Sequence, residues 1–436
     1  MPLLLLHSRR LRRPSLLLRR CIALQNARRP SRQPCANAST TLPQCLRCHR
    51  YSTGTGSARH DVQVACRSNG CVHLSILRRQ RDDALPSPIL LFLPPGPILS
   101  ETPPEHQDQL LRQLAHASNA TVVSVNYRAG DHHRYPAPVH DVLTAYDWVL
   151  ANLASQPQHC SPRKPHLARI GVCGELIGGS LATMLALTEC RMGTHRIAAA
   201  AVSNPVVDWI FPSDLHQEAE SENASDDLDV STVSTDDDGR IALQNKLKKN
   251  PDAHISSWDK YGGNPALPLS AVVHARASLF PSADAYFDRF ACPIHFFRTP
   301  GIGYVVPTKT EDDLASEVPR EFDTIENPEP VLETLKPIIE KRRRSPRLYP
   351  PTGMGLRLPV MSISVGEESV LRDQSEELVR LIKRSVIRDT RNEDEAGRRA
   401  GLTLRPGAGL WSGHSRAPDW REEIGAIGEW FGRALA

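Results

Sequence analysis

The sequence has no apolar run that approaches the roughly 20 residues needed for a membrane-spanning helix, although 40% of its 436 residues are hydrophobic. We therefore expect no transmembrane segment. The apolar content is sufficient instead for an extensive buried core, in one large α/β domain or in two smaller ones.

Acidic residues are absent from the first 51 positions, which contain eleven arginines; the first carboxylate is that of Asp61. Arginine pairs alternate with short leucine runs in "MPLLLLHSRRLRRPSLLLRR" and give a basic amphipathic pattern. Arg-rich, Ser-rich and acid-poor N-termini are typical of organellar transit peptides. The leucine runs at 3–6 and 16–18 are shorter than the unbroken apolar region of about 7–15 residues in a secretory signal.

The end of this segment carries a second targeting signal. The step Arg50-Tyr51-Ser52 resembles the matrix-protease cleavage sites of fungal mitochondrial precursors. We therefore predict a mitochondrial transit peptide over residues 1–51 and a location in the mitochondrial matrix. The alternative is an N-terminal extension without function, produced by a wrongly assigned start codon.

The net charge of +4 combines two unlike parts of the chain. Without the eleven N-terminal arginines, 42 basic residues remain against 49 acidic ones, so the rest of the chain carries about −7. A nucleic-acid-binding domain needs a concentrated basic surface. We therefore expect no nucleic-acid partner.

The ten cysteines give little sign of a metal or disulfide framework. Cys45 and Cys48 have the Cys-x-x-Cys spacing, but no second pair lies nearby, so we predict no metal site and no cofactor. Cys66 and Cys71 flank "RSNG" between two alternating segments that indicate a hairpin. A cross-strand disulfide is conceivable there, whereas reduced thiols are the rule in a matrix protein.

After this hairpin region, which covers residues 52–84, apolar strands alternate with amphipathic helices. That alternation predicts an α/β fold with a mostly parallel, doubly wound sheet flanked by helices over residues 85–434. The predicted strands are 87–96, 120–128, 168–174, 197–209, 292–300 and 358–366; the predicted helices are 105–118, 138–153, 177–191, 375–387 and 420–435.

Two stretches interrupt the alternation. Residues 217–240 are acidic, rich in Ser and Thr and almost without apolar residues, which predicts a disordered insertion. Residues 308–349 form a second insertion with the basic run "EKRRRSPR". That run could bind an anionic surface or a partner, although such runs are more often solvated loops.

The stretch "GVCGELIGGSLATMLALTE", residues 171–189, reads as a strand, a tight turn and a helix. Serine hydrolases hold their nucleophile in such a turn as G-x-S-x-G. Here the glycine spacing is present as Gly174 and Gly178, but the middle residue is Leu176. A leucine side chain has no atom that a base could activate as a nucleophile.

Three segments carry a resemblance to a known family. They are "VVSVNYRAGDHHRYPAPVHDVLTAYDWV", "IGVCGELIGGSLA" and "LPVMSISVGEESVLRDQSEELV". In this order the chain resembles an α/β-hydrolase of the hormone-sensitive-lipase-like group, which includes arylacetamide deacetylases and carboxylesterases, over roughly residues 85–434. The resemblance implies the α/β-hydrolase fold and a site made of a nucleophile, a base, an acid and oxyanion donors.

The oxyanion donors of the family are degraded in this chain. The family places His-Gly-Gly-Gly after the strand that matches "ILLFL", whereas this chain has Pro94-Pro95-Gly96-Pro97. Proline has no N–H to donate. Loss of a single oxyanion donor typically costs about 10²–10³ in rate.

No neighbour of Leu176 is a convincing substitute for the nucleophile. Glu175 is expected to be structural or to face solvent, since an acid before the apex is ordinary in the family. Cys173 should be buried in the core, where a thiol is usually inert, and Ser180 should pack within the helix.

The acid and the base are equivocal. Alignment with the family's G-x-x-D places Ser369 at the acid position, with Glu367, Glu368 and Asp373 close by. The segment "RPGAGLWSGHS" resembles the family's G-x-x-H loop, and strict spacing from Gly407 gives Leu410. His414 lies four residues further on and reaches the site only if the loop bulges; otherwise it is a solvated loop histidine.

We therefore expect a catalytically silent α/β-hydrolase-like protein that acts by binding an apolar acyl or ester-like ligand or a protein partner. In this hypothesis Leu176 closes the floor of a pocket that also includes Pro94, Pro95, Gly96 and Glu175. Gly174 and Gly178 remain because the turn demands positive φ and close packing. The alternative is an active carboxylesterase or lipase-like serine-type hydrolase with a non-standard nucleophile.

Overall fold

The computed structural model describes residues 49–51, 57–66, 70–79, 87–99, 103–154, 160–161, 164–165, 169–192, 196–211, 256–305, 338–341, 343–411 and 420–435. The predicted transit peptide apart from His49–Tyr51, the predicted insertion at 217–240, most of the one at 308–349, and His414 lie outside these ranges.

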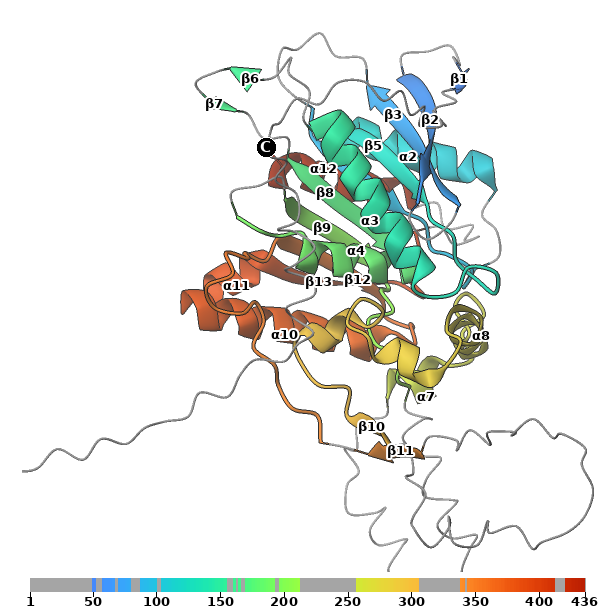
Figure 1. Ribbon diagram of the computed structural model, residues 1–436, viewed down its shortest axis with the longest axis vertical. Helices are drawn as coiled ribbons and strands as arrows, with labels where there is room; N and C mark the ends of the chain where they lie inside the picture. Colours follow the sequence, from blue (N-terminus) through green and yellow to red (C-terminus); the bar gives the residue numbers. More distant parts are fainter. Residues whose placement is uncertain are drawn as a thin grey trace, which may run out of the picture. The chain divides into compact units, whose positions relative to one another are not determined.

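The described strands form one large sheet in the order β1-β2-β3-β5-β4-β8-β9-β12-β13, drawn across the centre of Figure 1. The first pairings, up to β3 with β5, are antiparallel, and every pairing from β5 to β13 is parallel. The strands are β1 His49–Tyr51, β2 Ser57–Ala65, β3 Cys71–Arg79, β4 Ile89–Leu93, β5 Thr121–Asn126, β8 Ile170–Glu175, β9 Ile197–Ser203, β12 Val360–Gly366 and β13 Ala400–Arg405. The prediction of a mostly parallel sheet is confirmed.

Two small ribbons lie outside this sheet: β6 Cys160–Ser161 with β7 Lys164–Pro165, and β10 Ile302–Val305 with β11 Ile338–Lys341. The helices are α2 Pro104–Ser118, α3 Ala137–Val149, α4 Leu176–Thr188, α7 Ser257–Tyr261, α8 Leu269–Leu279, α10 Arg372–Thr390, α11 Glu393–Arg399 and α12 Trp420–Ala434. Three short irregular helices complete them: a π-helix at Leu150–Ala154 and 3₁₀ helices at Ala283–Phe287 and Pro293–Phe296.

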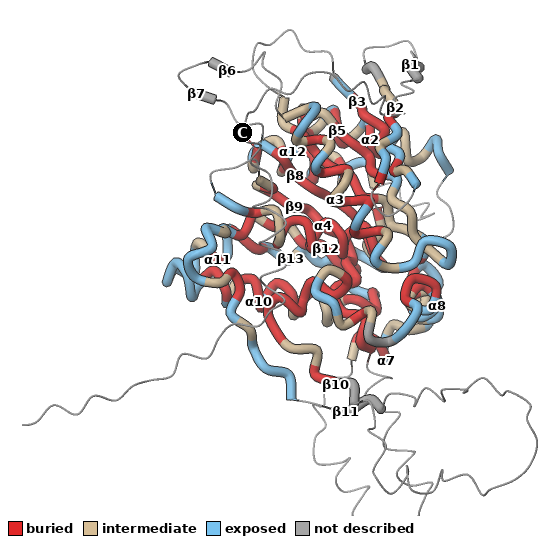
Figure 2. Tube along the Cα trace, viewed as in Figure 1, coloured by how far each residue is buried: buried red, intermediate tan, exposed pale blue. Residues whose placement is uncertain are grey.

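The sheet divides the core into two layers because successive strand residues point to opposite faces. In β4, Ile89, Leu91 and Leu93 join the layer that contains α3, α4 and α10, while Leu90 and Phe92 join the layer that contains α2 and α12. Strands β4 and β8 are buried at every position, as parallel strands covered on both faces must be. Figure 2 shows the resulting buried centre.

The predicted strand at 292–300 is wrong. Residues Pro293–Phe296 form a 3₁₀ helix, with proline at its first position. The segment is apolar because it is fully buried against the sheet layer, and a short apolar run does not distinguish a strand from a buried helical turn. The sequence analysis also missed β13, an edge strand whose side chains are mostly exposed.

The predicted hairpin is confirmed, and its cysteines are free thiols. Cys71 pairs with Ala65, so Cys66 lies one residue beyond that pair. Side chains of adjacent strand residues point to opposite faces. Cys66 and Cys71 are therefore badly placed for a disulfide.

Among the described residues, no helix combines the length and the apolar content that crossing a bilayer requires.

Candidate functional site

The turn from β8 into α4 has the geometry of a nucleophile elbow. Leu176 is the first residue of α4, with φ 52°, and is fully buried. A left-handed backbone costs an L-residue about 1–2 kcal/mol, so the turn holds a leucine in a conformation that its side chain disfavours. The strained backbone is therefore present without a nucleophilic atom at its apex.

The glycines of the turn are required for close packing and not for positive φ, which corrects part of the expectation from sequence. A Cβ on Gly174 would lie 2.4 Å from the carbonyl oxygen of Gly178. A Cβ on Gly178 would lie 2.2 Å from the carbonyl oxygen of Pro94. The residue with positive φ is Leu176 itself.

The loop after β4 presents carbonyl oxygens to the elbow. The Ile177 N–H donates to the Pro95 carbonyl at 3.3 Å, and the Tyr127 hydroxyl donates to the Pro94 carbonyl at 2.7 Å. Gly96 has φ 75°, and a Cβ there would lie 2.9 Å from the Tyr127 hydroxyl. In α/β-hydrolases the N–H of the residue after the nucleophile is an oxyanion donor, and here that N–H already has an acceptor.

The acid position holds a buried serine with a local role. Ser369 is fully buried, and its hydroxyl oxygen accepts the N–H of Leu371 at 3.2 Å. The neighbouring acid Asp373 accepts the N–H of Ser257, the first residue of α7, at 2.8 Å. Glu367 and Glu368 are exposed. None of these carboxylates is bound to a histidine in the described part of the chain.

At the base position, backbone contacts fill the space between neighbouring loops. A Cβ on Gly366 would lie 2.4 Å from the Ala408 carbonyl oxygen. The Asn204 amide donates to the carbonyls of Ala408 at 3.0 Å and Gly409 at 2.9 Å. Leu410, which follows, is half-buried. The backbone of the loop that would carry the base therefore binds the side chain of Asn204 after β9 and packs closely against Gly366 at the end of β12.

Glu175 connects the elbow to this same loop. Its side chain is buried, and its Oε1 accepts the backbone N–H of Trp411. The structural role expected for Glu175 is therefore the one observed, and the solvent-facing alternative is not.

A small cavity of about 20 Å³ lies beside the first turns of α4. A cavity of this size has room for about one water molecule. It is lined by Tyr135, Pro138, Ile177, Ser180, Leu181, Trp209, Leu279, Phe280, Phe290 and Ala291. Pro94, Pro95, Gly96, Glu175 and Leu176, which the sequence placed in a pocket, are not among them; the side chain of Leu176 joins the hydrophobic core.

The two other candidate nucleophiles are both buried. Cys173 belongs to the opposite core layer, and burial raises the pKa of its thiol. Ser180 lines the small cavity, and its hydroxyl donates to the Ala291 carbonyl at 3.4 Å. No hydrogen bond joins Ser180 to a histidine among the described residues.

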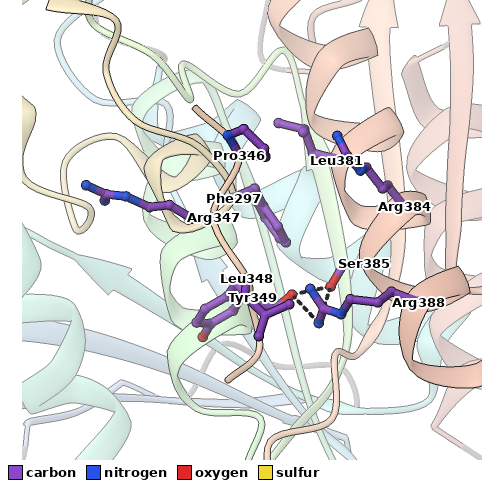
Figure 3. Close-up of a pocket in the computed structure, with 9 residues that line it drawn as sticks. All are labelled: Phe297, Pro346, Arg347, Leu348, Tyr349, Leu381, Arg384, Ser385 and Arg388. Carbon is purple, nitrogen blue, oxygen red and sulfur yellow. Dashed lines mark hydrogen bonds between the residues drawn. The ribbon is translucent and has the colours of Figure 1, made fainter. Parts of the chain in front are cut away.

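A larger pocket of about 370 Å³ opens between α10 and residues 346–349 (Figure 3). Its apolar walls were not predicted from the sequence. Apolar side chains supply most of the lining, and three arginines surround them. The lining residues are Phe297, Pro346, Arg347, Leu348, Tyr349, Leu381, Arg384, Ser385 and Arg388. Pro346 and Arg347 are the last residues of the run "EKRRRSPR", so the end of that run forms a pocket wall.

The three arginines differ in the hydrogen bonds that they make within the protein. Arg388 donates to the carbonyls of Tyr349 at 3.1 Å and Pro350 at 3.3 Å. Arg347 donates to the His295 carbonyl at 3.1 Å, and burial together with the nearby Arg289 lowers its pKa. Arg384 is exposed and makes no hydrogen bond or ion pair with the described part of the chain. Arg384 is therefore the cation most free to meet a ligand.

Comparison with known proteins agrees with this architecture. The profile of a family described as alpha/beta hydrolase fold matches residues 92–290. The chain is 31% identical over 127 residues to esterase LipI of Mycobacterium tuberculosis (strain ATCC 25618 / H37Rv), covering 29% of this chain and 37% of the relative. It is 35% identical over 111 residues to gibberellin receptor GID1 of Oryza sativa subsp. japonica, and this match covers 25% of this chain and 30% of the receptor. The matches thus span about a third of these curated relatives.

Solved esterases share the fold over most of their length. The hyperthermophilic esterase of the archaeon Pyrobaculum calidifontis superposes with a TM-score of 0.50 at 18% identity, covering 86% of this chain and 83% of that one. Carboxyl esterase 2 of the mycorrhizal fungus Tuber melanosporum superposes with a TM-score of 0.51 at 16% identity, covering 88% of this chain and 90% of that one.

The sheet order, the elbow and these matches define an α/β-hydrolase fold protein. Within that fold, the chain is similar to esterases and arylacetamide deacetylases of the hormone-sensitive-lipase-like group. The similar proteins include some named as esterases and one named as a receptor, so the similarity alone does not determine an activity.

Proposed function

We propose that this protein is a catalytically silent member of the α/β-hydrolase fold that acts by binding a ligand. The observation that carries the proposal is the hydrogen bond from the Ile177 N–H to the Pro95 carbonyl, next to a leucine at the apex of the elbow. The Pro95 carbonyl oxygen takes the place of the oxyanion as the acceptor of that N–H. It would have to leave before the N–H could stabilise a developing oxyanion.

The kinetic cost of these changes is large. Removal of the serine of a hydrolase triad costs about 10⁶ in kcat, and each lost oxyanion donor costs about 10²–10³. These effects are not additive. The catalysis of about 10³–10⁴ over water that survives the loss of a triad serine comes from the oxyanion hole and from substrate binding, and the oxyanion hole is also degraded here. We expect ester hydrolysis at the background rate.

Fluorophosphonate labelling and hydrolysis of short-chain aryl esters by the purified chain test this proposal. The wild type and Leu176→Ala should both be unlabelled and inactive. Leu176→Ser should also stay inactive, because a serine without a base and without oxyanion donors is a poor nucleophile. Labelling of the wild type would contradict the proposal, and brisk turnover by Leu176→Ser would mean that a base and donors are in place.

The ligand that we propose is an acyl compound with an anionic head, bound in the pocket of Figure 3. Apolar walls at Phe297 and Leu381 suit an acyl chain, and Arg384 at the rim suits a carboxylate. A relative named as a receptor supports a binding role for the fold. We place the protein in the mitochondrial matrix, because of the basic, acid-free N-terminus.

Titration with a fluorescent long-chain fatty acid tests the ligand. Arg384→Glu should weaken binding by about tenfold or more, because it replaces a charge-assisted contact by repulsion. Arg380→Glu is the matched control, since Arg380 is an exposed arginine of the same helix that does not line the pocket. Equal affinities in both variants, or no binding by the wild type, would reject this ligand.

The second candidate is an active hydrolase with a non-standard nucleophile, and the position of Ser180 on the small cavity favours it. If the wild type hydrolyses esters, Ser180→Ala should abolish the activity and Cys173→Ala should not, because Cys173 lies in the other core layer.

A further inference from the structure

Three potential metal ligands meet inside the core, and none of them lines the pocket of Figure 3. Asp208 follows β9, Cys292 directly precedes the 3₁₀ helix Pro293–Phe296, and His295 lies within that helix. One ligand atom from each residue lies within 4.8 Å of the other two. The exposed fractions are 3% for Asp208 and 0% for Cys292 and His295.

His295 is the unsatisfied member of this cluster. Neither of its ring nitrogens has a hydrogen-bond partner of normal geometry among the described residues, although the backbone of Phe287 lies close to the ring. A buried polar group without a partner destabilises a fold, and a metal ion would satisfy it.

We propose that Asp208, Cys292 and His295 bind a zinc ion as a buried site with three protein ligands. Thiolate, imidazole and carboxylate are the ligand types that zinc takes in proteins. Bond lengths of about 2.0–2.3 Å place neighbouring ligand atoms of a tetrahedral site about 3.3–3.8 Å apart. The Asp208 Oδ1 to His295 Nε2 distance of 3.8 Å agrees with that spacing.

The groups around the ligands already orient them. The Trp209 N–H donates to the Cys292 sulfur at 3.2 Å, and the Ile210 N–H donates to Asp208 Oδ1 at 3.0 Å. Such contacts to ligand atoms are regular features of protein metal sites. Burial and the nearby Asp208 carboxylate raise the pKa of the Cys292 thiol and outweigh the Trp209 N–H, so the thiolate would form only as the metal binds.

The charges balance when a divalent ion is included. Arg298 lies 2.6 Å from Asp208 Oδ2, but Glu377 lies 3.0 Å from Arg298, so the arginine is shared between two carboxylates. Asp208, Glu377 and Arg298 together carry one net negative charge, and a Cys292 thiolate would add a second, which a divalent cation would neutralise. Arg380, 3.6 Å from Glu377, is exposed and screened by water. Arg344, 4.0 Å from the same Asp208 oxygen, is largely exposed and screened by water.

The site would fix the wall of the small cavity beside the elbow. Trp209 and Ala291, the chain neighbours of Asp208 and Cys292, both line that cavity. A zinc ion would join the end of β9 to the segment around Pro293 at this point. The same residues are unsuited to catalysis as a Cys-His-Asp triad, because Cys292 and His295 have no exposed surface for a substrate to reach.

Metal analysis of the full chain, purified from zinc-supplemented medium, tests the site. The wild type and Cys190→Ser should contain about one zinc per chain, since Cys190 is a buried cysteine outside the cluster. Cys292→Ser and His295→Leu should contain at least tenfold less. His295→Leu keeps an apolar side chain of similar size, so circular dichroism should show a folded protein.

Cobalt substitution gives a second measurement that does not depend on the variants folding. The cobalt-loaded wild type should show a near-ultraviolet thiolate-to-cobalt band, and Cys190→Ser should retain it. A wild type that takes up no metal and shows no such band, or a Cys292→Ser variant that keeps its zinc, would overturn the proposal. Both readouts are independent of ligand binding at Arg384 and of ester hydrolysis.

Discussion

Replacing Leu176 by glycine and by alanine measures the strain in the elbow. Either change removes a fully buried side chain, and Leu→Ala in a core costs about 2–5 kcal/mol of unfolding free energy. Alanine keeps the left-handed strain of about 1–2 kcal/mol, whereas glycine relieves it. Glycine also loses one buried methyl group, about 0.8 kcal/mol, so it should be as stable as alanine or up to about 1 kcal/mol more stable.

Leu185 provides the matched control, because it is also fully buried and lies inside the same helix α4. There glycine should be less stable than alanine by about 2 kcal/mol, from its low helix propensity and the lost methyl group. The glycine-minus-alanine difference should therefore be about 2–3 kcal/mol more favourable at position 176 than at 185. Urea unfolding followed by circular dichroism gives all four values.

The same difference at both positions would refute the reasoning. It would mean that Leu176 carries no backbone strain, and that the turn is an ordinary helix start. The two-site comparison cancels the cost of losing the leucine side chain itself, which is the least certain part of the estimate.

Three further predictions concern the packing of the elbow, the pH dependence of stability and the N-terminus. Gly178→Ala should destabilise the fold by about 3 kcal/mol, because the added Cβ would meet the carbonyl oxygens of Pro94 and Leu93 at 2.2 and 2.3 Å. The control Gly397→Ala, whose Cβ would meet nothing within 4 Å, should stabilise the fold slightly, and thermal unfolding compares the two variants. Burial raises the pKa of Asp141, but hydrogen bonds from the Arg128 side chain and backbone outweigh it and hold the pKa below 3.8. The ionised Asp141 therefore stabilises the fold above about pH 4, and this contribution is lost at lower pH. The unfolding free energy of Asp141→Asn should fall furthest below that of the wild type near neutral pH, and the difference should shrink below about pH 4. N-terminal sequencing of the protein from its native cell should find a start near Tyr51, and a chain that keeps Met1 would reject the targeting proposal.

The central strands could be predicted from sequence because a strand buried on both faces is a continuous apolar run. The segments around β4, β5, β8, β9 and β12 all have this signature. β13 lacks it, because Gly401, Thr403 and Arg405 interrupt its apolar residues in a half-exposed edge strand. The segment at 292–300 is apolar for a different reason, since it packs as a buried turn, and length and composition alone do not separate the two cases.

For the site, only the missing catalytic groups could be predicted from the sequence. Leu176 has no nucleophilic atom, and Pro94 and Pro95 have no N–H to donate. The direction of the Pro95 carbonyl, the positive φ of Leu176 and the fastening of Glu175 to Trp411 depend on three-dimensional packing. The Cys-x-x-His spacing of Cys292 and His295 was a readable signal, but its third member, Asp208, is joined to it only by the fold.

The elbow, the loop after β4 and the loop after β13 are joined by internal hydrogen bonds. The Ile177 N–H, an oxyanion donor in hydrolases, is bound to the Pro95 carbonyl, and Glu175 is bound to the N–H of Trp411. The base loop is held in place by Asn204. A site that had only lost its serine would keep these groups free, and one substitution would restore it. Here a restored serine would face a donor that is already bound and a cavity with room for about one water molecule, so the binding role that we propose is assigned to the arginine-lined pocket beside α10.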